Sequence, residues 1–130
     1  HKLSKLMRNI LFYSPDLNFC ASMLMFFNDK YSVTTTTSLE TFESILNSSN
    51  FDLLVIDSEP TPKINELCKK ISSEEKHSPI ILTYVYTIKY KQIEQELKQI
   101  VDAIFYKPID MVEVSQKIDY FFRRLTLSAS

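Results

Sequence analysis

Residues 51–60 contain the feature that most constrains the fold, a run of apolar residues from Leu53 to Ile56 that ends in Asp57. The run is rich in branched side chains and too short for a helix, which is typical of a strand buried on both faces of a parallel sheet. Ligands of open α/β sheets bind just beyond the carboxyl ends of the strands. Asp57 therefore occupies the position of a binding residue, unless its carboxylate only caps the next helix or closes a turn.

Length and composition set the class of protein. A chain of 130 residues with 45% hydrophobic content is expected to form one folded domain, 1–130. The formal net charge of -1 gives no reason to expect binding to nucleic acid or to a membrane surface. We find no apolar run long enough for a transmembrane helix and no signal peptide. We expect residues 1–7 to be a tag or leader and residues 126–130 to be a linker or the end of a cut chain.

The use of glycine and cysteine narrows the class further. Glycine is absent, so turns must be formed by Asn, Asp, Ser and Pro, and no glycine-rich phosphate loop can exist. The cysteines Cys20 and Cys68 fall within apolar helical patterns, which indicates buried thiols rather than a disulfide or a metal pair. Such thiols suit a reducing cytoplasm, so we expect a cytoplasmic protein.

Apolar patterns along the chain predict five strands that alternate with five helices. The strands are expected at 9–13, 31–37, 53–56, 79–85 and 102–106, and the helices at 17–28, 38–46, 64–71, 88–100 and 111–125. The β-branched strand at 31–37 is typical of a sheet edge. The helix at 17–28 is apolar nearly all round, so we expect it to pack deeply, with Phe19, Met23, Phe26 and Phe27 in the core.

Other helices carry more specific signals. Ser38 and Asp110 are predicted to cap the helices that follow them. The helix at 88–100 is expected to place Glu94 on an exposed polar face, paired with Lys98 one turn later. Strict alternation of strands and helices favours an α/β fold, a three-layer, flavodoxin-like (βα)5 doubly wound parallel sheet with strand order 2-1-3-4-5.

Polar side chains lie at the ends of three predicted strands. Asp57 ends the third strand, Thr83 lies near the end of the fourth, and Lys107 follows the fifth. In a sheet of order 2-1-3-4-5 these ends share one rim, so we expect the three side chains to converge. The strand 53–57, the strand 79–83 and the turn Tyr106-Lys107-Pro108-Ile109-Asp110 together resemble a receiver domain of a bacterial two-component response regulator, over nearly the whole chain.

The resemblance implies a function in phosphorelay signal transduction rather than an enzyme in its own right. Asp57 would accept the phosphoryl group, Thr83 would donate its hydroxyl to the aspartyl phosphate, and Lys107 would pair with a phosphate oxygen. The implied partner is a histidine kinase or a phosphotransfer protein. Receiver domains also dimerise or dock partners through the fourth helix, fifth strand and fifth helix, which fall here at 88–100, 102–106 and 111–125.

The metal site departs from the family pattern. Receiver domains use adjacent acidic residues after the first strand to hold Mg²⁺, and the corresponding residues are Ser14 and Pro15. Mg²⁺ prefers carboxylate and water oxygens, and here Asp57, Asp16 and Glu59 are the carboxylates left to supply them. The resemblance therefore implies that Mg²⁺ binds weakly, through Asp57 and Asp16, and that Asp57 accepts phosphate weakly if at all.

Two more positions depart from the pattern. The residue after Thr83 is usually small, and we expect the bulky Tyr84 to lie over the site. The aromatic residue that usually changes rotamer between signalling states corresponds to Ile104, which cannot act as the same switch.

Three alternatives to a phosphate-driven receiver remain open. The first is a phosphorylation-independent pseudo-receiver that works as a dimerisation or docking module. The second is a small phosphohydrolase, because Asp57-Ser58-Glu59 faintly resembles an Asp-x-Asp pair, although a second aspartate and a cap domain are missing. The third is a flavin binder, for which the loop Ser14-Pro15-Asp16 is too short and wrongly charged.

Overall fold

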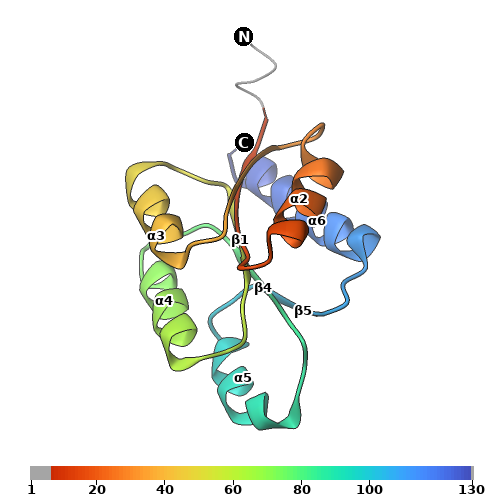
Figure 1. The fold of residues 1–130 in the computed structure, drawn as a ribbon. Coiled ribbons are helices and arrows are strands. Elements are labelled where there is room, and N and C mark those ends of the chain that lie inside the picture. Colours follow the sequence, from red (N-terminus) through yellow and green to blue (C-terminus); the bar gives the residue numbers. More distant parts are fainter. Residues whose placement is uncertain (1–6, 130) are drawn as a thin grey trace.

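The computed structural model describes residues 7–129, which form a parallel sheet covered by helices on both faces (Figure 1). The strands are β1 (Asn9–Tyr13), β2 (Ser32–Thr36), β3 (Leu53–Asp57), β4 (Ile80–Tyr84) and β5 (Ala103–Tyr106). The helices are α2 (Leu17–Phe27), α3 (Leu39–Ser48), α4 (Pro62–Ser72), α5 (Lys91–Leu97) and α6 (Met111–Ala129), with a 3-10 turn, η1 (Ile88–Tyr90), before α5.

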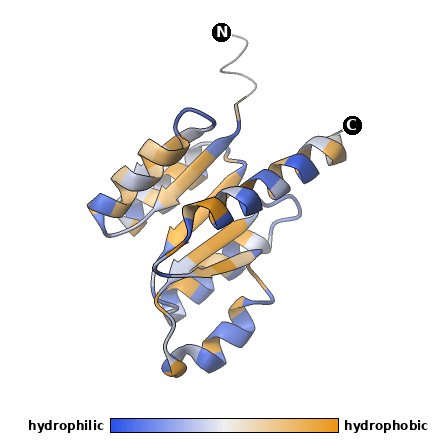
Figure 2. Cartoon of the chain, turned by 90° about the vertical axis from the view of Figure 1, so that its right-hand side faces the viewer, coloured by the Kyte–Doolittle hydropathy of each residue, from blue (hydrophilic) through white to orange (hydrophobic). Residues whose placement is uncertain are grey.

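The predicted topology is confirmed. The strands run parallel in the order β2-β1-β3-β4-β5, so β2 lies at an edge and β3 in the middle, as the sequence predicted. Figure 2 shows apolar residues along much of the sheet, whereas the edge strand β2 has a single apolar residue, Val33. All five residues of β3 are buried, because helices cover both of its faces.

Two apolar clusters hold the layers together. One packs α2 and α6 against a face of the sheet, through residues such as Met23 and Ile118. The other packs α3, α4 and α5 against the opposite face, through residues such as Phe42, Cys68 and Leu97. Side chains alternate between faces along a strand, so neighbours in β3 such as Leu54 and Val55 enter different clusters.

A chain without glycine must build its turns from ordinary backbone conformations. No described residue has a positive φ angle, and the helices end in right-handed or extended residues such as Asn28 and Ser49. Polar side chains cap the helix starts instead: Ser38 accepts from the N–H of Thr41, and Asp110 accepts from the N–H of Val112. Both predicted caps are confirmed.

Helix α2 packs against the sheet as predicted, but the prediction that Phe26 lies in its core is wrong. Cys20, Met23 and Phe27 are buried, but Phe26 is 43% exposed and Met25 is 84% exposed. A helix lying on a sheet buries one stripe of its surface, so a sequence that is apolar all round leaves apolar side chains in solvent.

Both cysteines are buried and free, as predicted, and burial raises the pKa of the Cys68 thiol to about 12.

The predicted leader at 1–7 lies almost wholly outside the described residues. Helix α6 continues to Ala129, through most of the segment predicted to be a linker. None of the helices within residues 7–129 combines the length and the hydropathy that a membrane span requires.

Replacing Leu54 by alanine should lower the free energy of unfolding by about 2–5 kcal/mol, because the side chain is fully buried in β3 and its loss leaves a cavity. Denaturation by urea, followed by circular dichroism, measures the change. Ile88→Ala is the matched control, because Ile88 is 73% exposed, and it should shift stability by less than about 0.5 kcal/mol. Equal losses in the two variants would contradict the buried position of β3.

Candidate functional site

Asp57 lies at the carboxyl end of β3 and is only 4% exposed. Thr83 donates its hydroxyl to Asp57 Oδ1 at 2.8 Å, and Lys107 Nζ lies 3.1 Å from each carboxylate oxygen. The structure therefore brings together the three residues that the sequence predicted to converge. Their roles in any reaction remain predictions.

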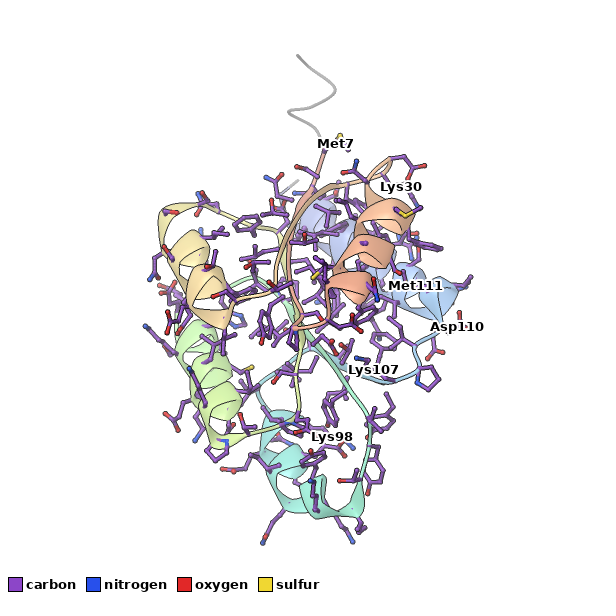
Figure 3. The ribbon with its side chains drawn as sticks, viewed as in Figure 1. Met7, Lys30, Lys98, Lys107, Asp110 and Met111 are labelled. Carbon is purple, nitrogen blue, oxygen red and sulfur yellow. The ribbon has the colours of Figure 1, made fainter. Side chains whose placement is uncertain are left out.

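The register of the sheet explains the convergence. Asp57 is paired with Thr83 across β3 and β4, so their side chains point to the same side of the sheet. Lys107 directly follows β5, where its backbone N–H donates to the carbonyl of Tyr84 at 2.9 Å. Figure 3 labels Lys107. Its side chain reaches Asp57, and Nζ lies 4.8 Å from the centre of the Phe19 ring. A cation over an aromatic face is favourable, so α2 helps to position the lysine.

Ser14 is a further contact of Asp57 that the sequence did not reveal. Its fully buried hydroxyl donates to Asp57 Oδ2 at 2.6 Å and accepts from the backbone N–H of Asp16 at 3.0 Å. The sequence identified Ser14 only as a missing acid. The sequence nonetheless contained a sign of this contact. Strand β1 lies next to β3, so a hydroxyl just after β1 lies beside the end of β3.

Asp16 does not join Asp57. Its Oδ1 accepts from the backbone N–H groups of Asn18 and Phe19, at 2.9 and 3.4 Å, and so caps α2. In the described part of the chain no three His, Cys, Asp or Glu side chains come close enough together to hold a metal ion. The groups that contact Asp57 are two neutral hydroxyls and one ammonium group. They fit Mg²⁺ poorly, because Mg²⁺ binds through carboxylate oxygens and water.

The expectation that Tyr84 lies over the site is wrong. Adjacent strand residues face opposite ways, so Thr83 points towards Asp57 while Tyr84 points to the face covered by α5. Tyr84 is 2% exposed there, and its hydroxyl donates to the carboxylate of Glu94. The small residue found in receiver domains is therefore replaced by a core side chain rather than by a lid. Ile104 is partly buried against the same cluster.

Glu94 was predicted to lie on an exposed face of its helix, but its side chain is buried. It is 6% exposed rather than solvated, and the hydroxyl of Tyr106 donates to its Oε2 at 2.9 Å. Its Oε1 lies 3.5 Å from Nζ of Lys98, so the predicted pair exists. Burial raises the pKa of Glu94, but the hydrogen bonds from both tyrosines and the charge of Lys98 outweigh burial and leave the pKa below its usual value. Burial and Glu94 together raise the pKa of Tyr106 to about 12.

Solved structures share this arrangement of strands and helices. The receiver-modulated diguanylate cyclase of Pelobacter carbinolicus is similar with a TM-score of 0.76 and 18% identity, over 95% of this chain and 98% of that chain. A response regulator of Clostridium difficile gives a TM-score of 0.77 and 21% identity, over 92% and 98%. The chain has the receiver-domain fold.

A chemotaxis response regulator of Vibrio cholerae has the same fold, with a TM-score of 0.74 and 19% identity over 88% of this chain and 98% of that chain. Similarity at these identities shows the receiver fold. No protein-family model and no curated protein matches the sequence.

Replacing Lys107 by methionine should lower the free energy of unfolding by about 2 kcal/mol. The substitution leaves the buried carboxylate of Asp57 without its cation. Because Lys107 is 30% exposed, water can reach the site and offset part of that lost stability. Adding Asp57→Asn should restore much of the loss. Lys69→Met is the control, because Lys69 pairs with Glu66 at the surface and should cost under about 0.5 kcal/mol. If the changes in the free energy of unfolding caused by Lys107→Met and by Asp57→Asn simply add in the double variant, as measured by denaturant melts, the ion pair would be excluded.

Glu94 should make the receiver fold sensitive to acid. Because its pKa is lower in the folded chain than in the unfolded chain, the ionised carboxylate stabilises the fold at neutral pH. That contribution is lost as the pH falls from about 5 through the folded pKa. The stability difference between the wild type and Glu94→Gln should therefore shrink towards about pH 3, as measured by urea denaturation at several pH values. The exposed Glu96→Gln is the control, and a constant difference for Glu94→Gln would contradict this account.

Proposed function

We propose that the chain is a receiver module of cytoplasmic two-component signalling, in which Asp57 accepts a phosphoryl group weakly if at all. The donor would be a histidine kinase or a phosphotransfer protein. The observation that supports this most directly is the convergence of Asp57, Thr83 and Lys107 at the carboxyl ends of adjacent strands. The receiver fold supports it independently of the site.

The three side chains suit phosphoryl transfer. An oxygen of Asp57 would form a bond to phosphorus while the bond from phosphorus to the donor nitrogen breaks. Such transfers pass through a loose transition state with negative charge on the equatorial oxygens. The hydroxyl of Thr83 and the ammonium of Lys107 lie within 3.1 Å of the carboxylate and are therefore near those oxygens. No group of the chain would need to act as a separate acid or base.

The charge balance of the site is the reason to expect that Asp57 accepts a phosphoryl group only weakly. The carboxylate of Asp57 and the ammonium of Lys107 already neutralise each other, and Ser14 adds no charge. A phosphoryl group adds negative charge without a further cation to offset it. One charge pair near a protein surface contributes about 4 kcal/mol at 4 Å, so a missing cation lowers the rate on the order of a thousandfold. The hydrogen bond from Ser14 must also be given up.

A phosphorylation-independent docking module is the second candidate. The donors around Asp57 already satisfy both carboxylate oxygens, so the folded site needs no added group. Exposed apolar side chains gather near the ends of β4 and β5, where Tyr86 and Tyr106 rings lie 5.3 Å apart and Val85 is 57% exposed. This surface suits a homodimer or a partner protein through α5, β5 and α6. A phosphohydrolase gains no support, because Glu59 pairs with the hydroxyl of Tyr90 instead of Asp57. Burial and then Glu59 raise the pKa of Tyr90.

The wild-type chain incubated with acetyl phosphate and Mg²⁺ should give a phosphoryl adduct in only a small fraction of molecules, measured by intact mass. Asp57→Asn should abolish that adduct. Ser14→Asp restores an acid beside Asp57, so it should increase the adduct and make the melting temperature rise with Mg²⁺.

Stoichiometric phosphorylation of the wild type would contradict the weak-acceptor proposal. An adduct that persists in Asp57→Asn would place the acceptor elsewhere. Hydrolysis of a phosphate ester by the wild type, lost in Asp57→Asn, would support the phosphohydrolase instead.

A further inference from the structure

We propose that the groove between α4 and α5 binds an extended, uncharged peptide segment of a partner protein through the side-chain amides of Asn65, Gln92 and Gln95. The inference goes beyond the proposed function, because it involves neither Asp57 nor a phosphoryl group. The residues that line the groove come from α4, η1, α5 and the turn after α5, rather than from β5 or α6.

The groove is a shallow site on the surface. Helices α4 and α5 lie beside each other in the lower half of the molecule in Figure 1. The space between them has a volume of about 830 Å³. Of its lining residues Asn65 is buried and Ile93 is half-buried, whereas the others are exposed. Sites for small molecules enclose most of the ligand, so this groove is better suited to a chain segment that lies along it.

Asn65 supplies the observation that points to a ligand. Its side chain is 7% exposed, and its Oδ1 is buried without a hydrogen-bond partner among residues 7–129. Buried amides are nearly always hydrogen-bonded, because an unpaired one has lost its bonds to water. The other buried residues of α4, Ile64, Leu67 and Cys68, are apolar.

The buried amide is therefore unfavourable in the chain alone, where an apolar side chain would pack without that loss. A ligand in the groove accounts for it. The amide of Asn65 can rotate about its last side-chain bond, so that either its oxygen or its nitrogen pairs with a group that enters the groove.

Glutamines of α5 extend the row of amides. Gln92 and Gln95 are three residues apart and so share a face of the helix, and Gln99 follows one turn later. A side-chain amide carries both a donor and an acceptor, as each peptide group does, so a row of amides can pair with the backbone of an extended chain. The charges of Lys89 and Glu96, which also line the groove, offset each other. The lining therefore favours an uncharged segment.

The dimensions of the groove set the length of that segment. The lining extends from Lys89 to Gln99, roughly 15 Å at the helical rise of about 1.5 Å per residue. An extended chain of about five residues spans that length at about 3.3 Å per residue. Ile93 lies between the glutamines, and Pro62 lines the groove from α4, so the segment should carry an apolar side chain for them to contact.

Selection of a displayed library of random heptapeptides on the wild-type chain tests the site. The enriched peptides should be uncharged, and one of them, synthesised with capped ends, should shift the side-chain NH₂ signals of Asn65, Gln92 and Gln95 in ¹⁵N NMR spectra. Asn65→Leu, and the double variant Gln92→Ala with Gln95→Ala, should each weaken its binding about tenfold or more, measured by fluorescence anisotropy. Gln116→Ala is the matched control, because Gln116 is an exposed glutamine of α6, and it should leave binding unchanged.

Thermal melts give an independent arm. Asn65→Leu should leave the melting temperature unchanged or raise it, because leucine removes the unpaired amide. A lower melting temperature would mean that the fold itself needs the amide, and it would contradict the proposal.

Three results of the binding experiment would also overturn the proposal: no enriched peptide, enrichment of charged peptides, or binding that survives the double variant. The double variant keeps the test valid if Asn65→Leu fails to fold, because Gln92 and Gln95 are exposed. No phosphodonor is used, so this site and the proposed function can fail separately.

Discussion

The receiver fold of this chain depends on neutralising one buried carboxylate. Asp57 is fixed at the end of the central strand, where burial would be costly for an unpaired charge. Lys107 supplies the cation, and Ser14 and Thr83 supply hydroxyl donors. These side chains come from the ends of β1, β4 and β5, so satisfying Asp57 also ties four of the five strands together at one rim.

The same arrangement explains how the site differs from a metal-dependent receiver. Where an acidic residue would hold Mg²⁺, Ser14 donates a hydrogen bond directly to Asp57. On the other face of the sheet, Tyr84 replaces a small residue and joins Tyr106 in holding a second buried carboxylate, Glu94. The chain thus has two internally satisfied acids, one on each side of β4, and the peptide bonds between Thr83 and Tyr84 and between Tyr106 and Lys107 connect them.

The sequence predicted the topology and the convergence of Asp57, Thr83 and Lys107, because buried strands and strand ends follow from local pattern and from the geometry of parallel sheets. It did not predict the positions of Tyr84 and Glu94, because the face on which a side chain lies depends on where each element starts. Glu94 fits a solvated helix pattern equally well, and only the two tyrosine hydroxyls make its burial favourable. The contact from Ser14 was missed because a serine was considered only as a lost acid.

A titration with Mg²⁺, followed by amide NMR shifts of residues 14, 57, 58 and 83, tests most directly whether the chain's own donors satisfy Asp57. The account predicts small shifts that do not saturate, because Ser14 and Lys107 already pair with the carboxylate of Asp57, and no cluster of metal-ligating side chains adjoins it within residues 7–129. Saturable shifts centred on Asp57 at sub-millimolar Mg²⁺ would contradict it.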